Sequence, residues 1–226
     1  MDRGGGQGVG ARQGGGGRRF ARPADDPPGT SRLFVAVPVA DDVREAVAAL
    51  MRELAGAPIE QRALGQPRWV SVGGLHLTLR FLGATPNERI PELSGALTAV
   101  ARGVEPFRIE LGGGGAFPSP AHPRVLWIGV ASGEPQLAQL SERLNDELSG
   151  YGWPRDERPF NAHLTLARTD GVPGSDVRAR RLIELAHDVR LGWQADDLVL
   201  YRSHIGRGPS QYEIVASSPL NGRIAG

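Results

Sequence analysis

"GLHLTLRFLG", residues Gly74–Gly83, and "NAHLTLART", residues Asn161–Thr169, share the tetrapeptide His-Leu-Thr-Leu. Each copy lies in a run in which apolar and polar residues alternate, which is the pattern of a half-buried β-strand. A second copy is improbable by chance, whereas an internal duplication explains it directly. We therefore expect two halves built on one plan.

The segments around the two motifs follow the same order: strand, helix, motif strand, helix, strand. We expect helices at 41–56 and 91–102 in the first half, and at 137–150 and 176–186 in the second. Long connections and alternating strands favour an α+β fold with largely antiparallel sheets flanked by helices. We predict one domain over 32–226, with two pseudo-symmetric lobes formed roughly by 32–115 and 116–226. An active-site cleft would lie between the lobes.

Alternation assigns the motif residues to two faces of each strand. The polar face of each copy carries one imidazole and one hydroxyl, and that of the first copy also carries a guanidinium. By strict alternation, Arg168 would point away from His163 unless the strand bends. The predicted core face comprises Leu75, Leu77, Leu79 and Phe81 in the first copy and Ala162, Leu164 and Leu166 in the second; the predicted polar face comprises His76, Thr78 and Arg80, and His163 and Thr165. Trp69, Trp127 and Tyr201 are expected in the core.

Two imidazoles that flank one small volume suit a reaction in which one proton is removed and another is delivered. Histidine titrates near neutral pH, so one ring can be neutral while its partner is protonated. Hydrolysis of a cyclic phosphodiester has this demand, and threonine hydroxyls can donate hydrogen bonds to its non-bridging oxygens. Two alternatives stay open: a purely structural polar strand face, and a two-histidine metal site, which lacks a third ligand at matching spacing.

Composition limits the other possibilities. The chain has no cysteine, which excludes disulfides and thiolate chemistry. It has no apolar run long enough for a membrane span and no signal-peptide pattern, so we expect a cytoplasmic protein.

Residues 1–31 are rich in glycine and arginine and are predicted to be a disordered tail, with weak contacts to RNA phosphates as the functional alternative. That tail carries five Arg and three Asp, a net of +2; the whole chain is +1, so the remainder sums to −1. A nucleic-acid ligand is therefore expected to be held locally.

At the level of these motifs the sequence resembles the 2H phosphoesterase superfamily, and within it the bacterial and archaeal RNA 2′,3′-cyclic phosphodiesterases, also called 2′-5′ RNA ligase-like proteins. The resemblance extends over about 32–220. It is carried by "RLFVAV", "RWVSVGGLHLTLRFLG", "GAFPSPAHPRVLWIGV" and "RPFNAHLTLAR". Ala162 stands where relatives often have proline.

The resemblance implies His76 as the proton donor and His163 as the proton acceptor, with Thr78 and Thr165 binding phosphate. Arg168 matches an arginine that usually follows the second motif, and Arg80 is a further phosphate-binding candidate. The implied activity is metal-independent and cofactor-free hydrolysis of RNA terminal 2′,3′-cyclic phosphates to 2′-phosphates by a monomer. The partners would be RNA ends or small nucleotides. Two alternatives remain: 2′-5′ RNA ligation at the same site, and non-catalytic binding of RNA ends.

Overall fold

The computed structural model describes residues 27–56, 67–204 and 211–222. Two short 3₁₀ turns, η1 (Val72–Gly74) and η2 (Asn87–Arg89), accompany the helices and strands. The helices are α1 (Asp41–Gly56), α2 (Ile90–Ala101), α3 (Glu134–Gly150) and α4 (Ser175–Leu185). The strands are β1 (Thr30–Pro38), β2 (Arg68–Trp69), β3 (His76–Pro86), β4 (Phe107–Phe117), β5 (Val125–Ser132), β6 (His163–Arg168), β7 (Leu191–Ala195), β8 (Asp197–His204) and β9 (Gln211–Pro219).

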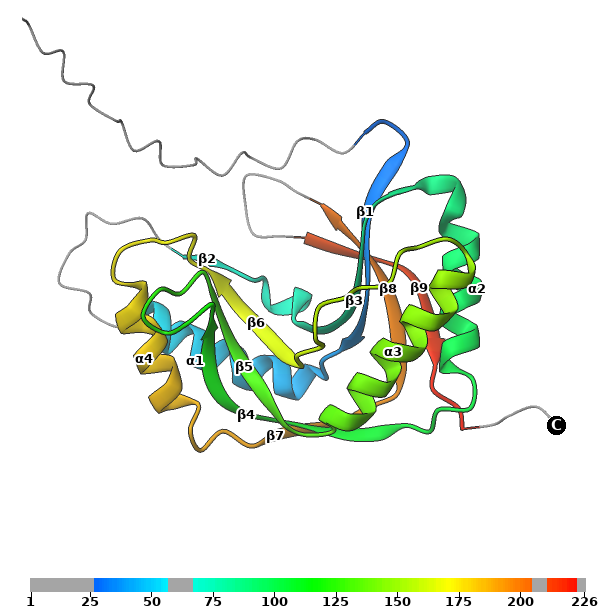
Figure 1. Ribbon diagram of the computed structural model, residues 1–226. Coiled ribbons are helices and arrows are strands. Elements are labelled where there is room, and N and C mark those ends of the chain that lie inside the picture. Colours follow the sequence, from blue (N-terminus) through cyan, green and yellow to red (C-terminus); the bar gives the residue numbers. More distant parts are fainter. Residues whose placement is uncertain (1–26, 57–66, 205–210, 223–226) are drawn as a thin grey trace, which may run out of the picture.

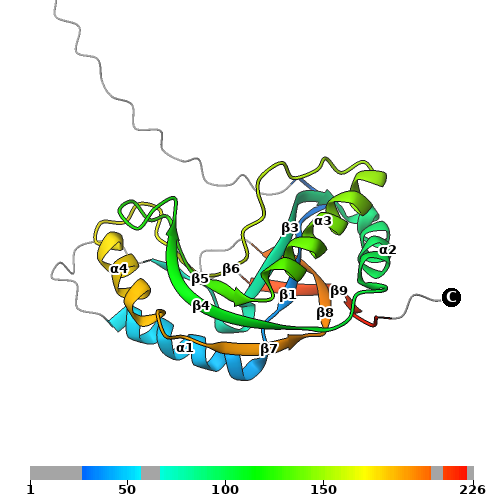
Figure 2. The ribbon, with the colours of Figure 1, turned by 60° about the horizontal axis from the view of Figure 1, so that its bottom comes forward.

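The strands form one antiparallel sheet in the order β7-β4-β5-β6-β3-β1-β8-β9, with β2 paired to β6. The sheet is strongly curled, so that its two arms lie at an angle to each other (Figures 1 and 2). The expected α+β class with antiparallel strands and flanking helices is thus confirmed. The two arms meet where β3 pairs with β6 through Leu77 and Leu164, which are equivalent residues of the two motifs.

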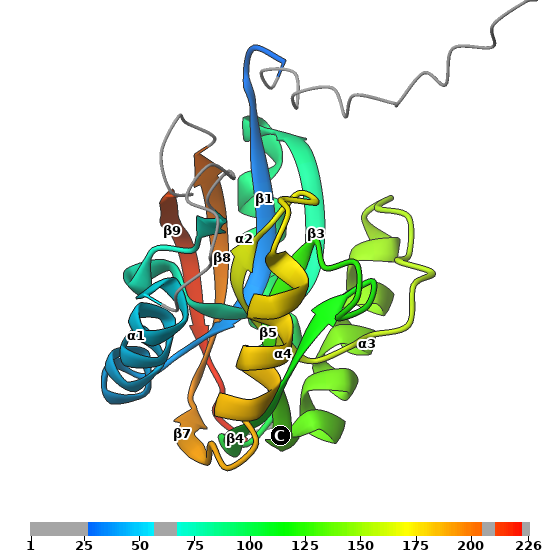
Figure 3. The same ribbon diagram turned by 90° about the vertical axis from the view of Figure 1, so that its left-hand side faces the viewer.

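The lobes do not coincide with the two halves of the sequence. One arm contains β3, β1, β8 and β9, and the other contains β6, β5, β4 and β7. Each half therefore contributes strands to both arms. The helices are exchanged in the same way: α2 and α3 pack against the first arm, and α4 and α1 pack against β4 and β7 of the second. Figure 3 shows α4 in front of β4 and β5.

The helices and one face of the sheet share a single hydrophobic core. In α1, whose first turn carries Asp41 and Asp42, the buried residues recur at helical spacing. In β1, every second residue from Leu33 to Val37 joins the same core. The helices thus cover the outer face of the sheet, and the concave face carries the residues between these positions. The buried α1 residues include Val43, Val47, Met51 and Leu54.

Each motif strand contains a β-bulge at the same place. Ala36 pairs with Thr78, but Val35 pairs with Arg80, so Leu79 is an extra residue in β3. In the second copy, Trp127 pairs with Thr165 and Leu126 pairs with Ala167, so Leu166 is the extra residue. A bulge shifts the alternation by one residue. Arg80 and Phe81 in β3, and Ala167 and Arg168 in β6, therefore lie on the faces opposite to those that strict alternation predicts.

The predicted tail, residues 1–31, lies mostly outside the described residues, which begin at 27. β1 begins at Thr30, two residues before the expected domain boundary. In the described part of the chain, no helix is long and apolar enough to cross a membrane.

Candidate active site on the concave face

His76 is the first residue of β3 and lies on the concave face of the sheet. Its Nδ1 is 2.6 Å from the carbonyl oxygen of Gly74, so Nδ1 carries the proton and donates it in a hydrogen bond. In the neutral ring Nε2 is then the unprotonated nitrogen. The ring of Phe34 lies 4.6 Å away between centroids, and that of Tyr212 packs edge-on at 5.0 Å. Tyr201 lies beyond at 5.7 Å. His76 is therefore held by one hydrogen bond and a set of aromatic contacts.

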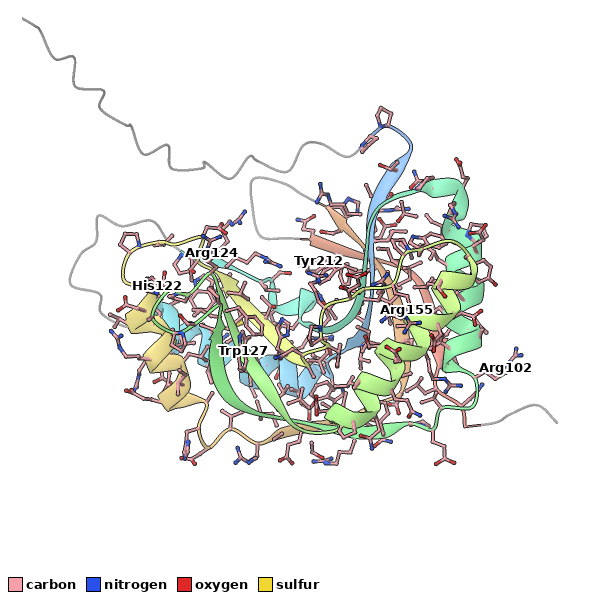
Figure 4. The ribbon with its side chains drawn as sticks, in the orientation of Figure 1. Arg102, His122, Arg124, Trp127, Arg155 and Tyr212 are labelled. Carbon is pink, nitrogen blue, oxygen red and sulfur yellow. The ribbon has the colours of Figure 1, made fainter. Side chains whose placement is uncertain are left out.

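His163 is held in the same way on the other arm. Its Nδ1 is 2.8 Å from the carbonyl oxygen of Asn161, again two residues earlier. Phe117 packs edge-on at 5.0 Å, and Trp127 lies at 6.3 Å. Figure 4 shows Trp127 and Tyr212 on opposite arms of the sheet. Both imidazoles thus use Nδ1 as a donor to the backbone and leave Nε2 for other chemistry.

Both histidines are harder to protonate than a histidine in water. Burial, together with the nearby charges of His163 and Arg168, lowers the pKa of His76 from 6.5 to about 4, against a smaller raising effect of the Gly74 hydrogen bond. Burial and Arg168 also lower the pKa of His163. These charge effects indicate that the two imidazoles and the Arg168 guanidinium share one region. Both rings are predominantly neutral in the free protein at pH 7.

The bulges decide where the two candidate arginines lie. Arg168 pairs with Val125, two positions from Trp127 on β5, and so lies on the same face as Thr165 and His163. The bend that the sequence analysis required is the bulge at Leu166. Arg168 also pairs with Arg68 of β2, whose guanidinium is bonded to the carboxylate of Asp170.

Arg80, in contrast, is turned away from the histidines, and its predicted role in phosphate binding is wrong. The bulge at Leu79 places it on the outer face, where it is 6% exposed. Its guanidinium donates to the carbonyl oxygen of Pro154 and lies 3.6 Å from the carboxylate of Asp156. Arg80 therefore connects β3 to the segment after α3.

Phe81 occupies the position that alternation gave to Arg80. It is 52% exposed rather than buried, because the same bulge turns it to the concave face. The other predicted core residues of the motifs are buried, and Thr78 and Thr165 share the face of their histidines. The expectation that Trp127 and Tyr201 lie in the core is wrong, since both contact the histidines.

Several residues of this site were not predicted from the sequence. Gly74 is buried, and a side chain there would collide with Tyr212. The one available signal for Gly74 was its place two residues before His76. Phe34, Phe117 and Tyr212 come from strands whose registers the sequence does not reveal. In the described residues, no group of three or more His, Cys, Asp or Glu side chains could hold a metal ion.

A curled antiparallel sheet with two His-x-Thr motifs on its concave face is the architecture of a 2H phosphoesterase. The family model for the 2′-5′ RNA ligase superfamily matches residues 52–207, more than half of the sequence, and the chain belongs to that superfamily.

Curated relatives fit this assignment. A protein of Archaeoglobus fulgidus named RNA 2′,3′-cyclic phosphodiesterase is 39% identical over 137 residues, which cover 61% of this chain and 72% of the relative. A protein of Aeropyrum pernix with the same name is 34% identical over 154 residues, which cover 66% and 85%.

Solved structures share the fold. The crystal structure of TT0787 of Thermus thermophilus has a TM-score of 0.65 at 28% identity, covering 84% of this chain and 97% of that one. LigT of E. coli, crystallised with 3′-AMP, has a TM-score of 0.63 at 24% identity, with 84% and 98% covered. The likeness to LigT supports the fold alone.

Proposed function

We propose that the protein hydrolyses RNA terminal 2′,3′-cyclic phosphates to 2′-phosphomonoesters by two-histidine acid–base catalysis. The observation that carries the proposal is the matched pair of imidazoles, each with Nδ1 bonded to a backbone carbonyl and Nε2 left for substrate. The names of the curated relatives supply the substrate class.

In the proposed reaction, Nε2 of His163 takes a proton from water, and the water oxygen attacks phosphorus. The bond from phosphorus to O3′ breaks as His76 gives a proton to the departing oxygen. Thr78 and Thr165 donate hydrogen bonds to the non-bridging oxygens, where negative charge is concentrated. Arg168 adds a cation at the same place, because its side chain shares the face of Thr165.

The donor role of His76 requires a proton that the free protein lacks at neutral pH, since burial holds its pKa near 4. A bound phosphate would place a negative charge beside the ring and raise that pKa. We therefore propose that substrate binding is coupled to protonation of His76. The acid group seen in the pH profile of kcat should then have a higher pKa than the pKa of His76 measured in the free protein by NMR.

We further propose that the protein acts as a cytoplasmic monomer without metal or cofactor, with residues 32–226 as the catalytic domain and 1–31 as a tail. RNA 2′-5′ ligation and non-catalytic binding are the competing functions at this site. Ligation needs the same acid and base in the same roles, with the 5′-hydroxyl group of a second RNA in place of water as the nucleophile.

The test uses a short RNA that ends in a 2′,3′-cyclic phosphate, incubated in EDTA with the wild type and with His76→Ala, His163→Ala and His187→Ala. His187 is a matched control, because its side chain is 81% exposed near the end of α4. We expect conversion to a phosphatase-sensitive 2′-phosphate by the wild type and the control alone.

Three results would contradict this function in different ways. Joining to an added 5′-hydroxyl RNA in preference to hydrolysis would favour the ligase. Tight binding of the RNA without turnover would favour the binder. Turnover that persists in His76→Ala or in His163→Ala would contradict the two-histidine mechanism.

A further inference from the structure

Four large apolar side chains form a row across the concave face of one arm. Phe81 of β3 pairs with Phe34 of β1, Phe34 pairs with Tyr201 of β8, and Tyr201 pairs with Ile214 of β9. Residues directly opposite each other in an antiparallel sheet point to the same face. The apolar row, as we call these four residues, therefore crosses four strands in one line.

The two ends of the apolar row are exposed although both are apolar. Phe81 is 52% exposed and Ile214 is 62% exposed, whereas Phe34 between them is 3% exposed. The ring of Tyr201 stacks on that of Phe34 at 5.3 Å, and the ring of Phe81 lies 6.0 Å from Phe34 on the other side. The row is thus a packed surface whose ends have no covering partner in the described residues.

The apolar row continues the proposed phosphate site. Along β3, His76, Thr78 and Phe81 follow one another on the concave face. At the matching position of the other motif strand, beyond Thr165, the side chain is Arg168. One arm thus offers an apolar surface where the opposite arm offers a cation. A nucleotide has the same division, with a flat base on one side and an anionic phosphate on the other.

The apolar row is longer than the surface on which one base can stack. Neighbouring strands lie about 4.8 Å apart, so the outer two of four strands are about 14 Å apart. Neighbouring rings that interact have centroids within roughly 4.5–7 Å of each other, so two neighbouring bases fit along this length. Aromatic surfaces hold bases without sequence preference, since every base has a π-face.

We propose that the apolar row binds the last two bases of an RNA end, the terminal base on Phe81 and its 5′ neighbour on Tyr201 and Ile214. The inference rests on the proposed hydrolysis and specifies its substrate: an oligonucleotide end is preferred over a mononucleotide. The second subsite is the part of the row that reaches the edge strand β9.

The test compares kcat/KM for cytidine 2′,3′-cyclic monophosphate with that for a dinucleotide ending in the same cyclic group. We expect the wild type to favour the dinucleotide at least about fivefold, within the range of stacking one base. Ile214→Ala should lower kcat/KM for the dinucleotide about fivefold more than for the mononucleotide, and Ile214→Trp should raise the preference. Phe81→Ala should lower both values about tenfold.

The matched control is Ile183→Ala, an isoleucine on α4 that is 37% exposed, which should leave the preference at the wild-type value. Equal kcat/KM for the two substrates in the wild type would overturn the second subsite while leaving the hydrolysis intact. Dimerisation that is lost in Ile214→Ala, without a change in preference, would show that a second copy covers the row. Failure to hydrolyse either substrate would remove the proposed function itself.

Discussion

Replacing Gly74 by alanine should damage the site through two contacts at once. Gly74 ends the turn before β3, and its carbonyl oxygen accepts the hydrogen bond from His76 Nδ1 at 2.6 Å. A Cβ at this position would lie 2.6 and 2.9 Å from two ring carbons of Tyr212 and 2.7 Å from Oγ of Ser71. Such distances are too short for carbon, so Tyr212 or the turn must move.

The size of the effect follows from these contacts. Overpacking by one methyl group in a closed site costs about 1–3 kcal/mol in the free energy of unfolding. Tyr212 packs edge-on against His76 at 5.0 Å, so its displacement is passed to the imidazole. A displacement of about 1 Å at a reacting group can cost on the order of 100-fold in rate. We therefore expect Gly74→Ala to lower kcat by about 10- to 100-fold.

Gly73→Ala is the matched control, because a Cβ at Gly73 has no atom within 4 Å. Both variants lose the same backbone freedom in the unfolded chain, so this contribution cancels in the comparison. Urea unfolding would give the stability, and hydrolysis of a cyclic-phosphate RNA would give kcat. Gly74→Ala behaving like Gly73→Ala in both assays would refute the reasoning.

Three further predictions concern His76, the two arginines Arg80 and Arg168, and the packing of Trp127. Because the pKa of His76 is lowered to about 4, the unfolded chain binds its proton from pH 6.5 downward and the folded chain does not. The contribution of His76 to the free energy of unfolding should therefore fall by about 3 kcal/mol between pH 6.5 and 4. Urea titrations should show this slope reduced in His76→Gln, and an unchanged slope would contradict it. Arg80→Met should cost about 2 kcal/mol of stability and leave KM unaltered, whereas Arg168→Met should raise KM; a raised KM in the Arg80 variant would contradict its outward placement. Gly115→Ala, whose Cβ would lie 2.3 Å from the Trp127 ring, should lower both stability and kcat relative to Gly95→Ala, which meets nothing within 4 Å.

The sequence predicted the parts of the fold that depend on local pattern. Helix α1 runs over the expected 41–56, because aspartates begin it and a glycine ends it. The alternation placed His76 and Thr78 on one face, and His163 and Thr165 likewise, since each pair is two residues apart before any bulge. The duplicated motif likewise indicated two similar arms.

The features that the sequence did not predict depend on the pairing with partner strands. An extra residue at Leu79 or Leu166 is defined by the register of β1 or β5, which the motif strand itself does not encode. One signal was present: Leu166 and Ala167 are consecutive apolar residues, which interrupts strict alternation. In the first copy the residue equivalent to Ala167 is Arg80, and its charge made the alternation of apolar and polar residues look regular. On the outer face this charge is neutralised by Asp156.

The sequence did not predict the exchange of strands between the arms, for a related reason. Chain order favours pairing within each half, yet β8 pairs with β1 and β4 pairs with β5. Which strands pair is decided by burial of the shared core, to which both halves contribute.

The central claim is that His76 and His163 act as one acid–base unit, and a double-mutant cycle on kcat for cyclic-phosphate RNA tests it most directly. Residues that act as a unit are strongly non-additive, so His76→Ala, His163→Ala and the double variant should each lose nearly the same large factor. Losses that multiply in the double variant would contradict the account, because they would show two imidazoles contributing independently.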